Sequence, residues 1–294
     1  MIDYGRIRSI KTNQSEEILC DILVLAIGHS ARDTYKLLYD KGIDIQQKDF
    51  AIGIRVQHPQ ELIDKNQYGM VYDKLPHASY KMTTQSSGRG VYTFCMCPGG
   101  YVVNSSSDEE HLCINGMSYH DRNSGSANAA VIVTTNKSDY MGSHPLAGVE
   151  FQRQLERNAF DIATGSIPVQ LYGDYEDGKI SSEYGSLEPQ FKGQVEFADI
   201  NKIFPDDINK SIKEAMYDFG KKIKGYDDPD VIIAAIESRT SSPIRIPRNE
   251  VGESNISGIY PCGEGAGYAG GITSAAMDGI KIAEDIMRVY KPLE

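Results

Sequence analysis

The feature that most constrains this chain is the glycine-rich segment PCGEGAGYAGG at residues 261–271. Gly265, Gly267 and Gly270 have the spacing G-x-G-x-x-G within it. The apolar residues 256–262 before it predict a short strand, and the residues after it predict a helix. Apolar residues recur there at helical spacing, with Lys281 and Glu284 facing out; they are Ile272, Ala276, Ile280, Ala283 and Met287. The segment therefore predicts a strand, a glycine loop and a helix in succession.

A dinucleotide-binding fingerprint also needs a second strand and an acidic residue about 20 positions further on, which holds the ribose. The sequence ends at Glu294, inside or just past the predicted helix, and leaves no room for that strand. We therefore expect that this unit is not the first βαβ unit of a Rossmann fold, and that its glycines have another purpose.

The start of the chain predicts strands and one helix. Residues 6–11 alternate between polar and apolar, as in a half-exposed strand. Residues 22–27 form a continuous apolar run that ends at Gly28, which is typical of a central parallel strand buried on both faces. Residues 31–41 predict a helix that Gly42 ends at the C′ position.

The middle of the chain is rich in predicted strands. The sequence predicts strands at 50–59, 89–97, 101–105 and 129–135, a helical turn at 59–64, and helices at 146–162, 206–223 and 228–235. The last of these is predicted from Asp228-Pro229-Asp230, which resembles an N-cap followed by proline at the first helical position. The fold class is therefore α/β with an α+β insert. We expect residues 1–49 and 239–294 to form one discontinuous α/β domain, and residues 50–238 to form an inserted β-rich domain.

Charge and cysteine content narrow the classes of partner. The net charge of −11 disfavours nucleic acid and anionic membrane surfaces. The five cysteines form no C-x-x-C pair, and their odd number indicates a reducing compartment. The sequence begins without a signal peptide and contains no run of eighteen apolar residues, so we expect a cytoplasmic protein that contacts no membrane.

Cys95 and Cys97 raise the question of thiol redox chemistry. Two residues apart on a strand, they would face the same side and be poorly placed for an unstrained disulfide. Packing or cofactor-facing thiols are the favoured interpretation, and a single reactive thiolate or a thiol-redox protein remains an alternative. The six histidines show no ligand spacing, so we expect no metal site.

Taken together, these segments resemble the C-terminal part of bacterial FAD-dependent dehydrogenases, the NAD(FAD)-utilising family of two-dinucleotide-binding-domain flavoproteins. The matching stretches lie at 21–34, 50–64, 89–103, 115–133, 151–160, 237–248 and 258–279. The FAD fingerprint that such enzymes carry near their N-terminus is missing, so the sequence resembles a truncated member. The resemblance implies a partial FAD/NAD(P)-binding Rossmann-like domain at 1–49 and 239–294 and a substrate or cap domain at 50–238.

The resemblance also implies a set of site residues. The cofactor-binding residues would be Gly28, Gly263, Glu264, Gly265, Gly270, Gly271, Ile272 and Thr273. Glu264 stands where the family usually carries Asp, which accepts hydrogen bonds from the ribityl chain. The N-terminus of the last helix would face the N1–C2=O edge of the flavin and stabilise negative charge there. The substrate-pocket candidates are Arg239, Thr240, Ser241, Arg245, Cys95 and Cys97, and no catalytic acid or base is assigned.

The function that follows is a FAD-dependent oxidoreductase that transfers a hydride to or from flavin N5. FAD is the implied cofactor, NAD(P)H a candidate electron donor, a small molecule the substrate, and a missing N-terminal FAD-binding segment a candidate partner. The alternative is a flavin-free, non-catalytic binding module that keeps the fold without the first βαβ unit.

Overall fold

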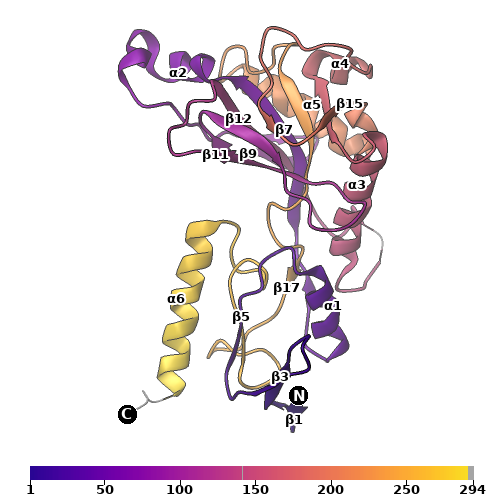
Figure 1. Cartoon of the computed structure of the whole chain (residues 1–294), viewed down its shortest axis with the longest axis vertical. Helices are drawn as coiled ribbons and strands as arrows, with labels where there is room; N and C mark the ends of the chain where they lie inside the picture. Colours follow the sequence, from indigo (N-terminus) through magenta and orange to yellow (C-terminus); the bar gives the residue numbers. More distant parts are fainter. Residues whose placement is uncertain (141, 291–294) are drawn as a thin grey trace. The chain divides into compact units, whose positions relative to one another are not determined.

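The computed structural model describes residues 1–140 and 142–290 of a mixed α/β protein. The chain divides into two compact units (Figure 1). The first unit contains residues 1–50, 136–151 and 239–294, and the second contains residues 51–135 and 152–238. Residues 136–151 thus belong with the chain ends, whereas the sequence prediction placed them in the insert.

The second unit is built on a seven-stranded sheet. Its strand order is β15 (Val195–Phe197), β13 (Ile167–Leu171), β16 (Ile232–Glu237), β7 (Phe50–Pro59), β12 (Ser126–Thr135), β9 (Arg89–Cys97) and β8 (Thr83–Ser86). Apolar residues on both faces of β7 suit its central place, and all of its residues except Pro59 are buried. Helix α5 (Asp206–Gly220) packs on β8, β9 and β12, and its buried apolar residues are Ile208, Ile212, Ala215, Met216 and Phe219.

Shorter elements complete the second unit. A three-stranded sheet has the order β11 (Ile114–Ser118), β10 (Gly100–Asn104) and β14 (Phe191–Lys192). The helices are α2 (Gln60–Tyr68), α4 (Tyr172–Asp177), the 3₁₀ turns η1 (Gly69–Lys74) and η2 (Ile200–Lys202), and most of α3 (Ala147–Ile162).

The prediction of a helix at 228–235 is wrong. The segment forms strand β16, which pairs antiparallel with β13 on one side and β7 on the other. Asp228 accepts a hydrogen bond from the Asp230 amide and its carbonyl accepts one from Val231, so the Asp-Pro-Asp segment forms a turn. The apolar residues that follow are buried on both faces of the sheet, and this burial outweighs the local helix signal.

The first unit contains α1 (Arg32–Asp40), α6 (Ile272–Val289) and four strand pairs. The pairs are β1 (Ile2–Asp3) with β2 (Arg6–Ile7), β3 (Ser9–Lys11) with β4 (Glu17–Leu19), β6 (Gln46–Gln47) with β17 (Ile244–Arg245), and β5 (Leu23–Leu25) with β18 (Ile259–Pro261). Gly42 ends α1 with φ +81°, as predicted. The main core cluster includes Tyr35, Leu38, Ile43, Ile244 and Ile259.

Strand β5 does not match its prediction as a central strand buried on both faces. Among the described residues it belongs to a two-stranded sheet, where it runs parallel to β18. Val24 in its middle is 43% exposed. The prediction of a parallel strand is confirmed, but the face of β5 that carries Val24 is exposed.

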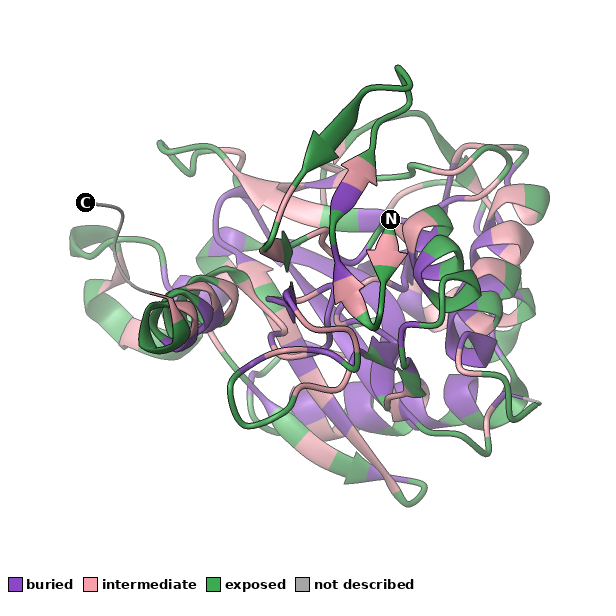
Figure 2. Cartoon of the chain, turned by 90° about the horizontal axis from the view of Figure 1, so that it is seen from below, coloured by how far each residue is buried: buried purple, intermediate pink, exposed green. Residues whose placement is uncertain are grey.

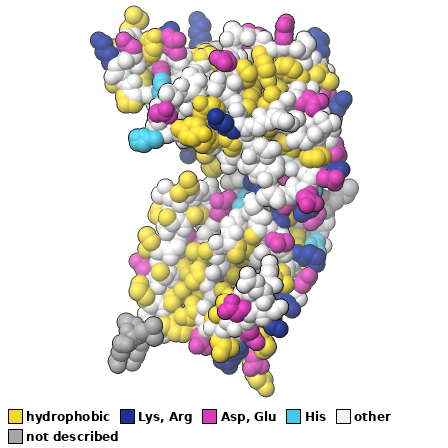
Figure 3. Space-filling view, viewed as in Figure 1, with side chains coloured by type: hydrophobic (Ala, Val, Ile, Leu, Met, Phe, Trp, Pro, Cys, Tyr) yellow, Lys and Arg dark blue, Asp and Glu magenta, His cyan; other side chains and the backbone are white. Residues whose placement is uncertain are grey.

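Helix α6 also differs from expectation, because its predicted apolar face is the exposed one. Ile272 is 93% exposed, Ile280 63% and Met287 68%. The buried residues of the helix are Asp278, Ile282 and Asp285. Figure 2 shows α6 largely exposed on one side and buried on the other, and Figure 3 shows hydrophobic side chains along it. No helix within the described residues is long and apolar enough to cross a membrane.

His58 is buried in the second unit, and we expect it to lower the stability of the folded protein at acidic pH. His58 stacks on Tyr226 and its Nε2 lies 2.9 Å from the Tyr226 carbonyl oxygen. Burial lowers the pKa of His58 to about 4, although the Tyr226 hydrogen bond opposes this shift. The unfolded chain, with an ordinary histidine pKa near 6.5, binds this proton first, so stability is lost as the pH falls from about 6.5 to about 4. We expect this one group to remove roughly 3 kcal/mol over that range.

Urea unfolding at pH 7, 5.5 and 4.5 measures this loss. In His58→Gln the free energy of unfolding should fall less over this range than in the parent chain. The matched control is His120→Gln, which changes an exposed histidine and should leave the pH dependence as it is. Equal slopes for all three proteins would contradict the assignment to His58.

Candidate functional site

Two glycine-containing loops meet in the first unit, where the parallel strands β5 and β18 end. Gly28 follows β5, and Gly263 and Gly265 follow β18. A Cβ atom on Gly265 would overlap the carbonyl oxygen of Gly28, so only glycine allows this close approach. The carboxyl ends of parallel strands are where ligands bind in α/β proteins.

Side chains hold these two loops in place. His29 Nδ1 lies 3.3 Å from Glu264 Oε1, which connects the loops directly. The Tyr35 hydroxyl donates to the Gly28 carbonyl at 2.9 Å, and Ser242 Oγ donates to the Gly265 carbonyl at 3.4 Å. Burial raises the pKa of Tyr35 to about 12, so this hydroxyl remains a donor at neutral pH.

The N-terminus of α6 follows the second loop. Gly271 is the N-cap residue with extended backbone, and no side chain of the described residues caps this end of the helix. Ser274 Oγ accepts from the Gly270 amide and donates to the Gly271 carbonyl. Ile272 and Thr273 in the first turn are exposed. The first amides of a helix carry about half a positive charge, so this end favours a negatively charged ligand group.

The glycines of the segment divide into packed and open positions. Gly265 and Gly267 press against the backbone of Gly28 and Ile244, respectively. A Cβ atom added to Gly28 would meet none of the described atoms within 4 Å, and one added to Gly263 or Gly271 would have its nearest neighbour 4.0 Å away. The open glycines leave the backbone accessible to a bound group.

The predicted substrate-pocket residues fall into two groups. Arg239 Nη1 donates to Ser30 Oγ at 2.9 Å, and Ser241 is the nearest neighbour of Gly270, so both lie beside the glycine loops with the buried Thr240. Arg245 donates to the Gly267 carbonyl at 3.2 Å and its guanidinium lies 4.4 Å from the Tyr268 ring centre, so it stabilises the loop itself. The other two candidates, Cys95 and Cys97, belong to the second unit.

An ion pair that the sequence analysis missed ties the loop to α6. Arg248 donates from two nitrogens to Asp278, at 2.9 and 3.1 Å, and lies 3.3 Å from the Tyr268 ring centre. The same carboxylate accepts from the Gly263 amide at 2.7 Å. Burial by itself would raise the pKa of Asp278, but the hydrogen bonds from Arg248 and Gly263 leave it below its usual value.

Lys48 is a further residue near the glycine loops that was not predicted from the sequence. Its Nζ donates to the Ser242 carbonyl at 3.4 Å. Burial and then the charge of Arg245 lower the pKa of Lys48, while Asp49 and Glu264 act in the opposite direction. An isolated lysine carries no spacing signal, so only the folded chain reveals this position beside the glycine loops.

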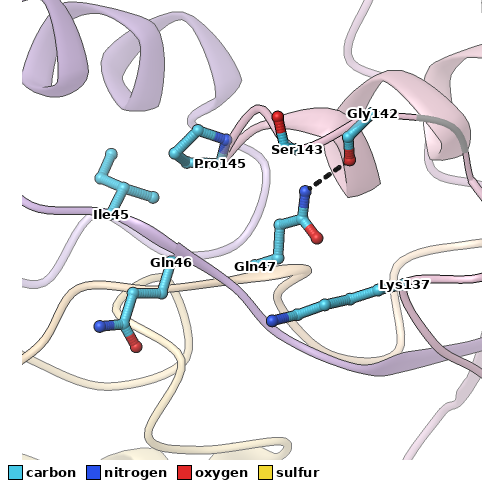
Figure 4. A pocket seen from close by; sticks show the side chains of 7 residues that line it. All are labelled: Ile45, Gln46, Gln47, Lys137, Gly142, Ser143 and Pro145. Carbon is cyan, nitrogen blue, oxygen red and sulfur yellow. Dashed lines mark hydrogen bonds between the residues drawn. The ribbon is translucent and has the colours of Figure 1, made fainter.

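A hollow elsewhere in the first unit has a volume of about 650 Å³ (Figure 4). Its lining residues are Ile45, Gln46, Gln47, Lys137, Gly142, Ser143 and Pro145. Gln47 points across it and donates to the Gly142 carbonyl at 3.0 Å. The lining includes none of the predicted site residues, so this hollow is separate from the glycine loops.

Comparison with known proteins relates this chain to FAD-dependent proteins. Residues 49–240, more than half of the chain, match the family described as FAD-dependent protein, C-terminal domain-like. The chain belongs to this family. An uncharacterised protein of Clostridium beijerinckii (strain ATCC 51743 / NCIMB 8052) is 49% identical over 293 residues, which cover 97% of this chain and 55% of that protein. The chain thus spans about half the length of this curated relative.

Proposed function

We propose that the chain is the C-terminal part of a FAD-dependent oxidoreductase of the dehydrogenase type. The observation that carries the proposal is the meeting of the Gly28 and Gly265 loops at the ends of two parallel strands, with Glu264 between them and α6 starting a few residues later. Residues 1–49 and 239–294 would form the Rossmann-like flavin-binding part, and residues 50–238 the part that selects the substrate.

The residues present fit such a cofactor. Gly28, Gly263 and Gly271 leave the backbone open to a planar ring, and the partly exposed Glu264 carboxylate can accept hydrogen bonds from ribityl hydroxyls. His29 orients that carboxylate, while Tyr35 fixes the Gly28 carbonyl. The uncapped amides of α6 would stabilise negative charge on the ring. When bound, FAD supplies a carbon–nitrogen ring system that takes up or releases a hydride.

The exposed apolar surface of the first unit supports a further part of this proposal. Ile272, Ile280 and Met287 form an apolar stripe on α6, and Val24 is exposed on β5. Such surfaces are normally covered by other polypeptide. We propose that a polypeptide equivalent to the part of the Clostridium relative outside the match covers them and completes the FAD site.

The test is FAD binding by this chain, alone and co-expressed with that part of the relative. Gly271→Asp adds a carboxylate at the start of α6, where a side chain has room and where Asp is also a favourable N-cap. The added carboxylate would repel a negatively charged flavin ring, and its oxygen would accept hydrogen bonds from the free amides at the start of α6. We expect a FAD dissociation constant at least 10-fold higher in this variant, with unchanged or slightly higher thermal stability.

Lys281→Gln is the matched control, because it changes the charge of the same helix by the same amount at an exposed position away from its start and away from the apolar stripe. It should bind FAD like the parent. Fluorescence quenching of FAD and absorbance near 450 nm measure binding. A complex that remains colourless would favour the flavin-free binding module, and equal affinity of Gly271→Asp and Lys281→Gln would remove α6 from the flavin site.

A further inference from the structure

A small cavity in the second unit lies at the end of strand β7. Gln57 pairs with Ile232 at the start of β16, and β7 continues beyond this pair to Pro59, so β16 does not cover this end of the strand. The volume of the cavity is about 190 Å³. Sites for drug-sized ligands have about 300–1,000 Å³, so this cavity suits a smaller molecule. Its wall includes Gln57, His58, Leu62, Leu187, Asp228 and Asp230.

The side chain of Gln57 leaves a buried hydrogen-bond donor unused. Gln57 is 1% exposed, and its Oε1 accepts from the backbone amide of Gln190 at 2.9 Å and from Ser126 Oγ at 3.3 Å. Because a backbone amide can only donate, the oxygen of Gln57 must face Gln190, and this fixes the orientation of the side-chain amide. Its Nε2 is buried and has no hydrogen-bond partner among the described residues.

His58 adds an unused acceptor. Its Nε2 lies 2.9 Å from the Tyr226 carbonyl oxygen, which can only accept, so Nε2 carries the proton. An ordinary histidine is already mostly neutral at pH 7, and burial lowers the pKa of His58 further, to about 4. Nδ1 therefore carries a lone pair, and it is buried without a hydrogen-bond partner in the part of the chain that the structure describes.

These two atoms indicate that a polar group occupies the cavity. Buried polar atoms almost always have a hydrogen-bond partner, and one left without a partner costs free energy. Gln57 and His58 are consecutive on β7 and point to opposite faces of the strand, but a molecule at the uncovered strand end can reach both faces. The group that satisfies both atoms must accept from Gln57 and donate to His58.

Two carboxylates give the cavity a negative charge. Asp228 and Asp230 are both exposed, so they lie toward the solvent, whereas Gln57 and His58 are buried. Asp228 Oδ1 accepts from the backbone amide of Asp230 at 3.0 Å. Neither carboxylate forms an ion pair with a described residue, so both charges are available to a ligand. The outer part of the cavity therefore favours a cation.

We propose that this cavity binds a small organic amine cation that carries a hydroxyl group at its other end. The ammonium group lies near Asp228 and Asp230. The hydroxyl group, which both donates and accepts, satisfies the two buried atoms of Gln57 and His58. The carbon chain between them contacts apolar wall residues such as Leu62. The site lies entirely in the second unit and is independent of the proposed flavin function.

Isothermal titration calorimetry of the full chain with four probes tests the proposal. Aminobutanol carries the amine and the hydroxyl at opposite ends. We expect it to bind more tightly, by a factor of about 5 or more, than butylamine, which lacks the hydroxyl, and than butanediol, which lacks the charge. Hydroxybutyrate, which carries a carboxylate in place of the ammonium, should not bind. Equal affinity of aminobutanol and either of the first two analogues, or no binding of any probe, would overturn the proposal.

A double variant places the cation at the two carboxylates. Asp228→Asn with Asp230→Asn should weaken aminobutanol binding by a factor of about 5 or more and leave butanediol binding unchanged. Both positions are exposed, and circular dichroism verifies that the variant is folded. The matched control is Asp73→Asn with Glu109→Gln, which removes the same charge from exposed positions outside the cavity wall. If both double variants bound aminobutanol like the parent, the carboxylates would not hold the cation and the proposal would fail.

Discussion

Glu237→Gln should lower the free energy of unfolding by about 3–5 kcal/mol, the largest effect that we expect from a single substitution. Glu237 is 3% exposed and holds Arg55, which is not exposed at all. Removing the carboxylate leaves a buried guanidinium with amide and carbonyl acceptors only. Urea unfolding monitored by circular dichroism at pH 7 measures the loss.

Asp177→Asn is the control for this experiment, since it removes a carboxylate from an exposed ion pair with Lys179 and should leave the unfolding midpoint unchanged. Replacing both buried partners, in Arg55→Met with Glu237→Leu, should recover part of the loss, because no charge is then left unpaired. A loss below about 1 kcal/mol in Glu237→Gln would mean that water reaches Arg55 in solution.

Asp278→Ala should have the second largest effect, a loss of about 2–4 kcal/mol. It removes the counterion of Arg248, whose side chain is 8% exposed, and the acceptor of the Gly263 amide. The pKa of Asp278 lies below its usual value, so its contribution is complete at neutral pH and is lost only as the pH falls below about 4. Thermal unfolding at pH 7 and pH 3 measures both the loss and its pH dependence.

Glu284→Gln is the matched control, because it changes an exposed carboxylate on the same helix. It should leave stability nearly unchanged at both pH values. If Asp278→Ala were as stable as Glu284→Gln at pH 7, the Arg248 ion pair would not hold the glycine loop to α6.

Most of the elements that local patterns predicted are present in the structure. Strands β7 and β9 have the predicted bounds, and helix α5 starts at the predicted residue. These segments carry a periodicity that agrees with their burial. The segment that became β16 carried a helix start signal and an apolar run at once, and its place between two strands decided between them. Helix α6 has its predicted position but turns its polar Asp278 inward, because Arg248 pairs with it.

For the candidate site as well, some features could be predicted from the sequence and others only from the fold. Gly28, Glu264 and the glycines from 263 to 271 could be selected from the sequence, because glycine marks places where the backbone turns or approaches another group. Their meeting could not, since His29 and Glu264, which connect the two loops, are 235 positions apart. Tyr35 and Arg55 lie in an ordinary helix and an ordinary strand, and Lys48 lies in the short segment between β6 and β7. Their local sequence carries no sign of their partners.

The sequence by itself determined where strands, helices and glycine loops form, since these depend on side-chain periodicity and on backbone freedom within a few residues. Only the tertiary structure decided which loops meet, which charged groups are buried together and which apolar faces stay uncovered. The physical reason is that the energies of buried ion pairs and of close backbone contacts depend on partners brought together from distant parts of the chain.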